Sequence, residues 1–330
     1  MRMPFAGSAV GLIRIGRRSS GLGGFGCSPG ADAWCVLDEP GDAHCFETSV
    51  DTGYEAYLPL RDANLEVERI EGDLEGFTPF GSGMLAWDKT TRAMRPVYGY
   101  TRWSPVAELA PGTFTQVEAP CALTPEGQVQ CWGRDSFRAE TSLSNAEVIA
   151  TSGDAVCAID PDGAVACVGQ NYAGQAGSRP RPNHSVRHSV IDGLPPARAI
   201  EGGDVHFCAI TRANDVWCWG HNGFGQLGDG TFVNSGRPLR VAGLPPIREI
   251  SLGIEHTCAL ADDGRVYCWG KNTGGQLGSP HLRVSAVPVR VDLPDEEVVE
   301  VEANGASSCA RTRDGEVWCW GSLIVSSMCS

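Results

Sequence analysis

Cysteine is the residue type in this sequence whose number and spacing offer the most chemistry. The chain has 14 cysteines. Cysteine thiolates bind metals, attack electrophiles or pair as disulfides. Twelve of the cysteines form six pairs with one spacing of ten positions: Cys35 and Cys45, Cys121 and Cys131, Cys157 and Cys167, Cys208 and Cys218, Cys258 and Cys268, Cys309 and Cys319. One spacing, repeated six times, indicates a structural role in a repeated unit.

The residues between paired cysteines predict a β-hairpin. Turn dipeptides such as Asp162-Gly163, Asp263-Gly264 and Asp314-Gly315 lie near the midpoint of a pair, flanked by apolar and β-branched residues. Cysteines equidistant from a turn face each other across two strands, where close non-hydrogen-bonded pairs approach disulfide geometry. We therefore predict six disulfides within hairpins, each stabilising the fold by at most about 3 kcal/mol.

Two alternatives to disulfides stay open for these pairs. Reduced cysteines could serve as small buried apolar residues. A zinc site is less favoured, because the sequence has no C-x-x-C motif and no closely spaced set of cysteine and histidine ligands.

The two cysteines outside this spacing are Cys27 and Cys329, one near each end of the chain. A bond between them would join the first and last blades of a ring and remove exposed sheet edges. The alternative for Cys27 is attachment of a lipid anchor, although the apolar segment that such a signal needs is missing.

A repeat of about fifty residues organises the chain. The segment "HFCAITRANDVWCWGHNGFGQLGDG" begins at His206, its copy begins 50 residues later at His256, and a third copy begins 51 residues later at Ser307. The copies that begin at Val156, Pro120 and Trp34 are progressively less similar. The segment Ile70–Thr78 matches Ile200–Cys208, with Thr78 and Asp88 at the two cysteine positions, which adds one more unit.

These seven units predict an all-β chain, a seven-bladed β-propeller of repeats about 50 residues long. Residues 31–330 are expected to form the propeller, with units 1–3 degenerate and units 4–7 well preserved. Residues 1–30, which are basic and rich in Gly and Ser, are expected to be disordered or to be the remnant of an export signal.

The run W-G-x-N-x-x-G-Q-L-G at Trp219–Gly228 and Trp269–Gly278, preceded by H-x-C-A-[IL], resembles the regulator-of-chromosome-condensation repeat. The resemblance implies a seven-bladed propeller. Some members of this family inhibit enzymes such as β-lactamases, and others stimulate guanine-nucleotide exchange on a small GTPase. The cysteine pairs depart from the eukaryotic pattern and are similar to those of bacterial, exported relatives.

Repeated residues are predicted to build the scaffold. Trp217 and Trp219 point to one face of a strand while Cys218 points to the other, and blades pack on both faces. His206 and His256 occupy one repeat position and are expected to bond to the blade backbone rather than act as bases. The run Gly21–Gly26 satisfies G-x-G-x-x-G, but no strand precedes it and no helix follows, so it does not predict a nucleotide site.

Residues that differ between units are the better functional candidates, because the shared scaffold does not explain them. They lie in four segments that are expected to line one rim: 134–140, 179–188, 232–237 and 281–284. The candidate partner-binding residues are Arg134, Phe137, Arg138, Arg179, Arg181, His184, Arg187, His188, Phe232 and His281. The alternative for each of them is a solvated loop without a function.

Charge limits the classes of partner. The formal net charge is −14, and residues 32–330 hold 22 basic and 40 acidic side chains. A surface this acidic repels phosphate backbones, so we expect no nucleic-acid partner. The sequence has no apolar run of the length a membrane span needs, about 20 residues. We expect a monomer that binds a protein partner and needs no cofactor or metal.

The leading functional hypothesis is a non-enzymatic binding scaffold that contacts another protein through one propeller rim. Because disulfides persist in oxidising compartments, we expect an extracytoplasmic location. The first alternative is a guanine-nucleotide-exchange regulator of a small GTPase, which would need a cytosolic, reduced protein. The second alternative is an enzyme with an active site on a rim, although no nucleophile, base and orienting group form a recognisable set.

Overall fold

The computed structural model describes residues 9–15, 32–38, 43–48, 58–59, 68–70, 74–80, 83–88, 94–98, 114–118, 121–132, 137–139, 143–153, 155–293 and 297–321. Before residue 114 the description covers the backbone of the strands. Across all of these residues, no helix is long and apolar enough to cross a membrane.

Every regular element of the described chain is a strand. In chain order the strands are β1 (Ala9–Ile15), β2 (Asp32–Asp38), β3 (Ala43–Thr48), β4 (Leu58–Pro59), β5 (Glu68–Ile70), β6 (Leu74–Phe80), β7 (Gly83–Asp88), β8 (Met94–Tyr98), β9 (Gln116–Glu118), β10 (Cys121–Leu123), β11 (Val129–Trp132), β12 (Phe137–Ala139), β13 (Val148–Ser152), β14 (Ala155–Ile159), β15 (Val165–Gln170), β16 (Ser185–Val190), β17 (Ala197–Gly202), β18 (His206–Thr211), β19 (Val216–Gly220), β20 (Ser235–Arg240), β21 (Ile247–Leu252), β22 (His256–Ala261), β23 (Val266–Lys271), β24 (Val284–Arg290), β25 (Val298–Asn304), β26 (Ser307–Thr312) and β27 (Val317–Gly321).

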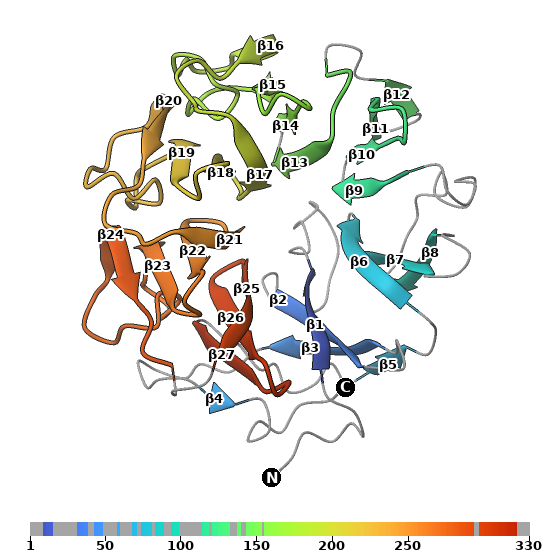
Figure 1. Ribbon diagram of the computed structural model, residues 1–330, viewed down its shortest axis with the longest axis vertical. Helices are drawn as coiled ribbons and strands as arrows, with labels where there is room; N and C mark the ends of the chain where they lie inside the picture. The colour runs from blue at the N-terminus through green and yellow to red at the C-terminus, as the bar shows by residue number, and fades with distance from the viewer. Residues whose placement is uncertain are drawn as a thin grey trace, which may run out of the picture.

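The described strands form seven antiparallel sheets that follow one another around a ring (Figure 1). Blades 1 to 7 are β1-β2-β3-β5, β6-β7-β8, β9-β10-β11-β12, β13-β14-β15-β16, β17-β18-β19-β20, β21-β22-β23-β24 and β25-β26-β27-β4. The first strand of each blade lies toward the middle of the ring and the last strand lies at its outer margin (Figure 1). The prediction of an all-β propeller is confirmed, and seven sheets are consistent with seven blades.

A strand from the N-terminal part of the chain completes the last blade. In β27, Trp318 and Cys319 pair with Pro59 and Leu58 of β4. Blade 7 therefore has four strands although the repeat that supplies it contributes three. The pairing of β4 with β27 joins the two ends of the ring and covers an edge of blade 7 that would otherwise be exposed.

Two N-terminal expectations differ from the structure. Residues 9–15, which the sequence places ahead of the propeller, form β1 and pair with β2, because the run AVGLIRI is apolar and rich in β-branched residues. The alignment of Ile70–Thr78 with Ile200–Cys208 is wrong in register. Ile70 ends β5, the outermost strand of blade 1, and Thr78 faces Leu85 rather than Asp88.

Five of the six predicted disulfides are present in the described residues. They join Cys121 to Cys131, Cys157 to Cys167, Cys208 to Cys218, Cys258 to Cys268 and Cys309 to Cys319. In each pair the cysteines face each other across the second and third strands, with Cα atoms 4.0 to 4.1 Å apart. Cys35 faces Cys45 in the β2–β3 register. The side chains of that pair, together with Cys27 and Cys329, lie outside the described residues.

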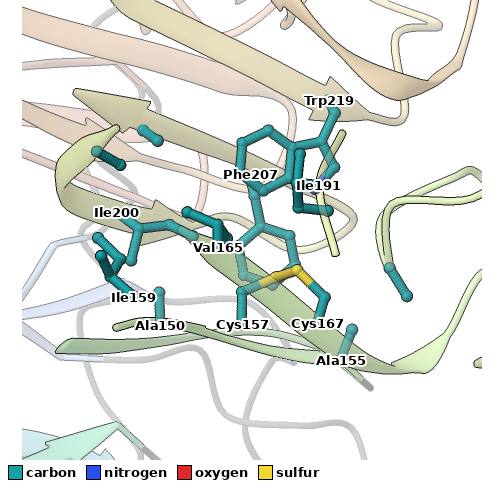
Figure 2. Packing of buried hydrophobic residues seen from close by; sticks show 13 residues of the cluster. Ala150, Ala155, Cys157, Ile159, Val165, Cys167, Ile191, Ile200, Phe207 and Trp219 are labelled. Atoms are coloured by element: carbon teal, nitrogen blue, oxygen red, sulfur yellow. A yellow bond between two sulfur atoms is a disulfide. The ribbon is translucent and has the colours of Figure 1, made fainter. Parts of the chain in front are cut away.

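The hydrophobic core is divided into layers between neighbouring sheets. Between blades 4 and 5, the disulfide of Cys157 and Cys167 packs with Phe207 and Trp219 (Figure 2). Trp269 and Trp320 take the place of Trp219 in the next two layers. Val168 takes it between blades 3 and 4, where the sequence shows the tryptophan replaced. Trp219 and Cys218 belong to different layers, as their alternation along β19 predicts.

Candidate interaction face

Alternation of strand direction gives the ring two faces. In blades 4 to 6, the first-to-second and third-to-fourth connections meet on one face, which we call the loop face. His221 N–H donates to Val205 O (2.9 Å) and Lys271 N–H to Glu255 O (2.8 Å), which joins these connections in blades 5 and 6. The hairpin turns and the links between blades meet on the other face, the hairpin face, where Arg212 N–H donates to Pro196 O (2.9 Å).

Repeated residues hold the long connections of the loop face in place. Asn222 is buried, and its Oδ1 accepts from Leu227 N–H (2.9 Å) while its Nδ2 donates to Asp229 Oδ1 (3.0 Å) and Thr231 O (3.1 Å). Gln226 Oε1 accepts from Phe224 N–H (3.0 Å). Asn171 and Asn272 bond in the same way in blades 4 and 6. The Asn and Gln of the repeated motif therefore serve loop geometry.

Backbone carbonyls of these connections fasten each blade to the next. Trp219 Nε1–H donates to Gln175 O (3.1 Å), Trp269 Nε1–H to Gln226 O (2.9 Å) and Trp320 Nε1–H to Gln276 O (2.9 Å). Each bond joins a tryptophan of one blade to the loop of the blade before it. The loops are thus anchored at both sides, which favours a rigid surface.

The repeated histidines join neighbouring blades through side chains, and the expectation that they bond to backbone is wrong. His206 is fully buried, with Nε2 2.9 Å from Thr257 Oγ1 in the next blade. Thr257 uses its one hydroxyl hydrogen on Gln226 O (3.0 Å), so it accepts a hydrogen bond from His206 Nε2–H. His256 lies 2.9 Å from Ser308 Oγ in the same way. Their role is architectural, as repetition predicts.

The predicted partner-binding residues lie on the third-to-fourth connections and on the outer strands that follow. Arg179, Arg181 and His184 lie between β15 and β16, Phe232 lies between β19 and β20, and His281 lies between β23 and β24. Arg187 and His188 belong to β16, and the backbone of Phe137 and Arg138 belongs to β12, so these four are strand residues rather than loop residues. Arg134 lies outside the described residues. The candidates therefore come from successive blades and form no single cluster.

Exposed apolar side chains mark the loop of blade 5. Phe232 is 52% exposed and Val233 is 70% exposed. Gly230 N–H donates to Ala286 O (2.9 Å), so this loop lies against β24 of blade 6, where Val287 is 52% exposed. Exposed apolar residues gathered in one region are typical of interaction surfaces.

A second cluster on the loop face was missed from the sequence. Lys271 Nζ lies 4.6 Å from the centre of the Phe224 ring and forms an ion pair with Glu255. The His221 and Phe224 rings pack edge to face. The distance between His221 Nδ1 and Gln226 Nε2 is 2.8 Å. Burial lowers the pKa of His221, against the opposing effect of Glu255 and Asp204. The sequence feature that could have identified this cluster is the variable position x of W-G-x-N. It is occupied by Gln170, His221 and Lys271 in blades 4 to 6.

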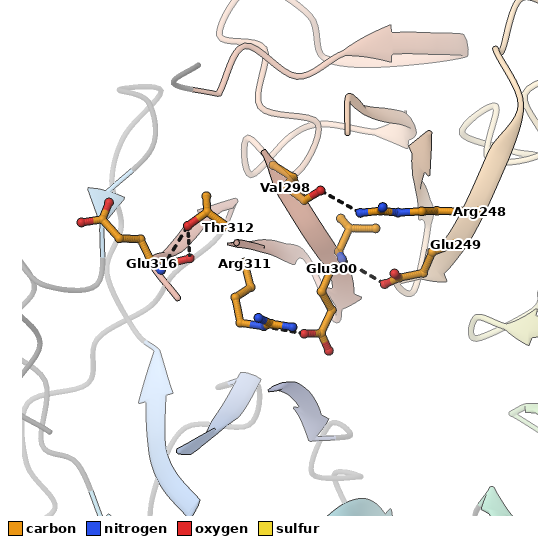
Figure 3. Close-up of polar contacts among 8 residues, drawn as sticks. Arg248, Glu249, Val298, Glu300, Arg311, Thr312 and Glu316 are labelled. Atoms are coloured by element: carbon orange, nitrogen blue, oxygen red, sulfur yellow. Dashed lines mark hydrogen bonds and ion pairs between the residues drawn. The ribbon is translucent and has the colours of Figure 1, made fainter. Parts of the chain in front are cut away.

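Charged side chains of the inner strands cap the backbone of the next blade. Arg248 Nη2–H donates to Val298 O (2.7 Å), and Glu249 Oε1 accepts from Val301 N–H (3.0 Å) (Figure 3). Glu300 pairs with Arg311 at 2.8 Å. Burial raises the pKa of Glu249 to about 7. These carboxylates have structural partners, and no group of three metal-ligating residues is found in the part of the chain that the structure describes.

Comparison with known protein families identifies the repeat from which this geometry is built. A model of the regulator of chromosome condensation (RCC1) repeat matches residues 214–260 and 263–310, and a second model of this repeat matches residues 197–226 and 247–276. The chain carries RCC1 repeats. The match at 214–260 runs from the β18–β19 turn to β22. An RCC1 repeat in this chain therefore supplies two strands to one blade and two to the next, and it contains the connection that fastens them.

Solved structures with this fold come from distant relatives. Prp20p from Saccharomyces cerevisiae, described with its binding to Gsp1p and histones, is 14% identical over 91% of this chain and 82% of its own, with a TM-score of 0.67. Human WBSCR16 is 17% identical over 99% and 89%, with a TM-score of 0.68. The ectodomain of the Arabidopsis thaliana receptor kinase ACR4 is 16% identical over 98% of each chain, with a TM-score of 0.59. At these identities the similarity concerns the fold.

Proposed function

We propose that this chain is a non-catalytic scaffold that binds a protein partner through its loop face. The observation that carries the proposal is the exposed pair Phe232 and Val233, which no repeated structural role explains, on a connection that Asn222 holds in place. Beside it, the Phe224, Lys271 and Glu255 cluster adds an aromatic and charged surface. Aromatic and basic side chains of this kind are enriched at protein interfaces.

The relatives support a binding role rather than catalysis. Prp20p was characterised with its binding to Gsp1p and histones, and the same protein, yeast RCC1, was solved in complex with Kap60. At 14% and 18% identity, these partners remain those of the yeast protein. What the relatives support is the general use of an RCC1-repeat propeller as a protein-binding surface.

A pair of matched variants tests the loop-face proposal. The loop-face variant is Phe232→Ser with Val233→Ser, and the control on the hairpin face is Ala213→Ser with Pro246→Ser; all four side chains are exposed. Intact protein and both variants are used to capture partners from the native source. We expect the loop-face variant to capture at least about tenfold less of the specific partners than the intact protein. The control variant is expected to capture them as the intact protein does. Equal capture by both variants would reject the loop face as the binding surface.

We also propose an extracytoplasmic location, in keeping with the five disulfides of the described residues. The competing hypothesis, exchange on a small GTPase, needs a cytosolic protein. Thiol trapping with a maleimide before cell lysis separates them. Unmodified paired cysteines are expected for an exported protein, whereas fully modified cysteines would favour the exchange hypothesis.

A further inference from the structure

The outermost strands of blades 4, 5 and 6 differ in how they protect their free edges. Strands β16, β20 and β24 each end the order of their sheet (Figure 1). An outer strand presents unpaired backbone groups on which another strand can add, and proline or charged residues at the edge oppose this addition. Pro238 and Pro288 lie in β20 and β24, whereas β16 contains no proline.

Strand register shows what replaces these prolines. Cys218 pairs with Leu239 and Cys268 with Val289, one residue after Pro238 and Pro288. In β16 the corresponding partner of Cys167 is Ser189, so His188 occupies the proline position. The next outer position along each strand holds Arg240, Arg290 and, in β16, Val190.

Hydrogen bonds show which backbone N–H groups of β16 point away from the sheet. Ile191 N–H donates to Val165 O (2.9 Å), and equivalent bonds join Val241 to Val216 and Val291 to Val266 at 2.9 Å. Hydrogen-bonded pairs recur at every second residue of an antiparallel ladder. Ser189 and Ile191 therefore face β15, while Val190 directs its N–H group away from the sheet. The β15–β16 register shifts between Cys167 and Gly169, so His188 lies in a β-bulge, where the ladder with β15 is interrupted. The prolines of β20 and β24 remove the N–H group at the position of His188.

The sequence that contains β16 is basic, in a chain of net charge −14. Between Gly163 and Ile191 it holds three arginines and two histidines and no acidic residue, and Asp162 and Asp192 flank this stretch. Arg179, Arg181 and His188 are exposed, and Val190 is 50% exposed. An open strand edge with basic and apolar side chains fits an extended strand that carries acidic residues.

We propose that β16 is a strand-addition site that binds an extended, acidic segment of a partner protein. The main-chain N–H groups of His188 and Val190 supply the pairing, and Arg179 and Arg181 supply the preference for acidic side chains. The site lies at the outer margin of blade 4 rather than among the loops of blades 5 and 6. It is therefore independent of the loop-face proposal, and each can fail without the other.

The test uses a fluorescent synthetic peptide of alternating glutamate and valine, about seven residues long, which is a common strand length. Binding to the intact protein is followed by fluorescence anisotropy, and amide exchange at His188 and Val190 is followed by NMR. We expect saturable binding and slower exchange at both amides. A lysine–valine peptide, and the glutamate–valine peptide N-methylated at alternate residues, are expected to bind at least about tenfold more weakly.

Two variants separate the backbone from the side chain. His188→Pro introduces the residue found at this position in β20 and β24. We expect it to lower the affinity for the glutamate–valine peptide by about tenfold or more. His188→Ala keeps the N–H group and is expected to bind within about threefold of the original protein. Absence of binding at millimolar peptide, equal binding of the N-methylated peptide, or equal affinities of the two variants would overturn the proposal. The N-methylated peptide keeps the test decisive if His188→Pro does not fold.

Discussion

At the scale of single residues, most of the chemically distinctive side chains serve the contact between blades. His206 reaches Thr257, Trp269 reaches the Gln226 carbonyl, and Glu249 reaches the Val301 amide, each across a blade boundary. Their spacing of about one repeat explains why such residues recur in the sequence. Exposed residues that do not join blades, such as Phe232, are the candidates we propose for recognition.

Gly236 provides a test of how closely neighbouring blades approach. A Cβ atom at Gly236 would lie 1.9 Å from Ser178 O, a backbone atom of blade 4. Gly236→Ala is expected to lower the free energy of unfolding by about 3 kcal/mol or more, because backbone must move. Gly243→Ala is the control: nothing lies within 4 Å of its Cβ, although its φ of +78° is strained. We expect the control to cost about 1 to 2 kcal/mol, measured by urea unfolding, and equal losses would contradict the close approach.

Glu249 predicts a particular dependence of stability on pH. Its pKa is raised from 4.5 to about 7 by burial, so between these values the folded protein holds a proton that the unfolded chain releases. The contribution of Glu249 to the free energy of unfolding therefore falls as pH rises from about 4.5 to about 7 and is level above that range. Glu249→Gln should remove this fall and be more stable at pH 8 by about 3 kcal/mol. Parallel stability curves for the two proteins from pH 5 to 8 would show that Glu249 does not titrate there.

At the scale of elements, the sequence predicts the hairpins better than the strands at the ring's margins. Cysteine spacing identified the second and third strands of blades 3 to 7, because both cysteines must face each other across one turn. It could not predict β4, since two residues, Leu58 and Pro59, complete a blade formed by residues more than 200 positions away. It also placed Arg187 and His188 in a loop, because the register of β16 is set by pairing with Cys167 and not by a repeated motif.

The candidate site was predicted in part, because its residues were found from differences between units and not from contacts between blades. Differences between units identified the third-to-fourth connections as the place of variation, and Phe232 and His281 lie there. The contacts of Lys271 with Phe224 and Glu255 could not be predicted. Phe224 is 47 positions away and meets Lys271 through the docking of blades 5 and 6, and Glu255 is 16 positions away and meets it across blade 6.

Asn222 is predicted to order the connection of blade 5 without being required for the fold. Asn222→Ala removes the acceptor for Leu227 N–H and the donors to Asp229 and Thr231. We expect amide exchange in residues 223–234 to rise by at least about tenfold, since each buried bond lost costs about 1 to 3 kcal/mol. Exchange in β18 and β19 should stay slow. Fast exchange throughout blade 5 would mean that Asn222 supports the blade itself.

The disulfides are predicted to contribute unequally to blade stability. The double variant Cys208→Ser with Cys218→Ser should lose about 2 to 3 kcal/mol, because both cysteines are fully buried in the layer that contains Trp269. Cys121→Ser with Cys131→Ser should lose less, since Cys131 is half-buried and Val168 stands in place of the tryptophan. Chemical unfolding of each variant gives the comparison. An equal loss in both would assign the effect to loop closure alone.

At the scale of the whole molecule, the ring separates stability from recognition. Disulfides, tryptophan bonds and buried layers occupy the interiors and junctions of the blades, while Phe232, Val233 and the cluster of Phe224 with Lys271 lie on the loop face. A rigid support lowers the entropy lost when its loops bind. From the net charge of the chain, −14, we expect electrostatic selection against nucleic acid and in favour of basic partner surfaces.

Hydrogen exchange of the intact protein with and without its captured partner tests this separation most directly. The account predicts protection on binding in the connections 221–234 and 272–283 of the loop face, with unchanged exchange in the turns 212–215 and 262–265 of the hairpin face. Protection confined to the hairpin face, or spread evenly over both faces, would contradict it.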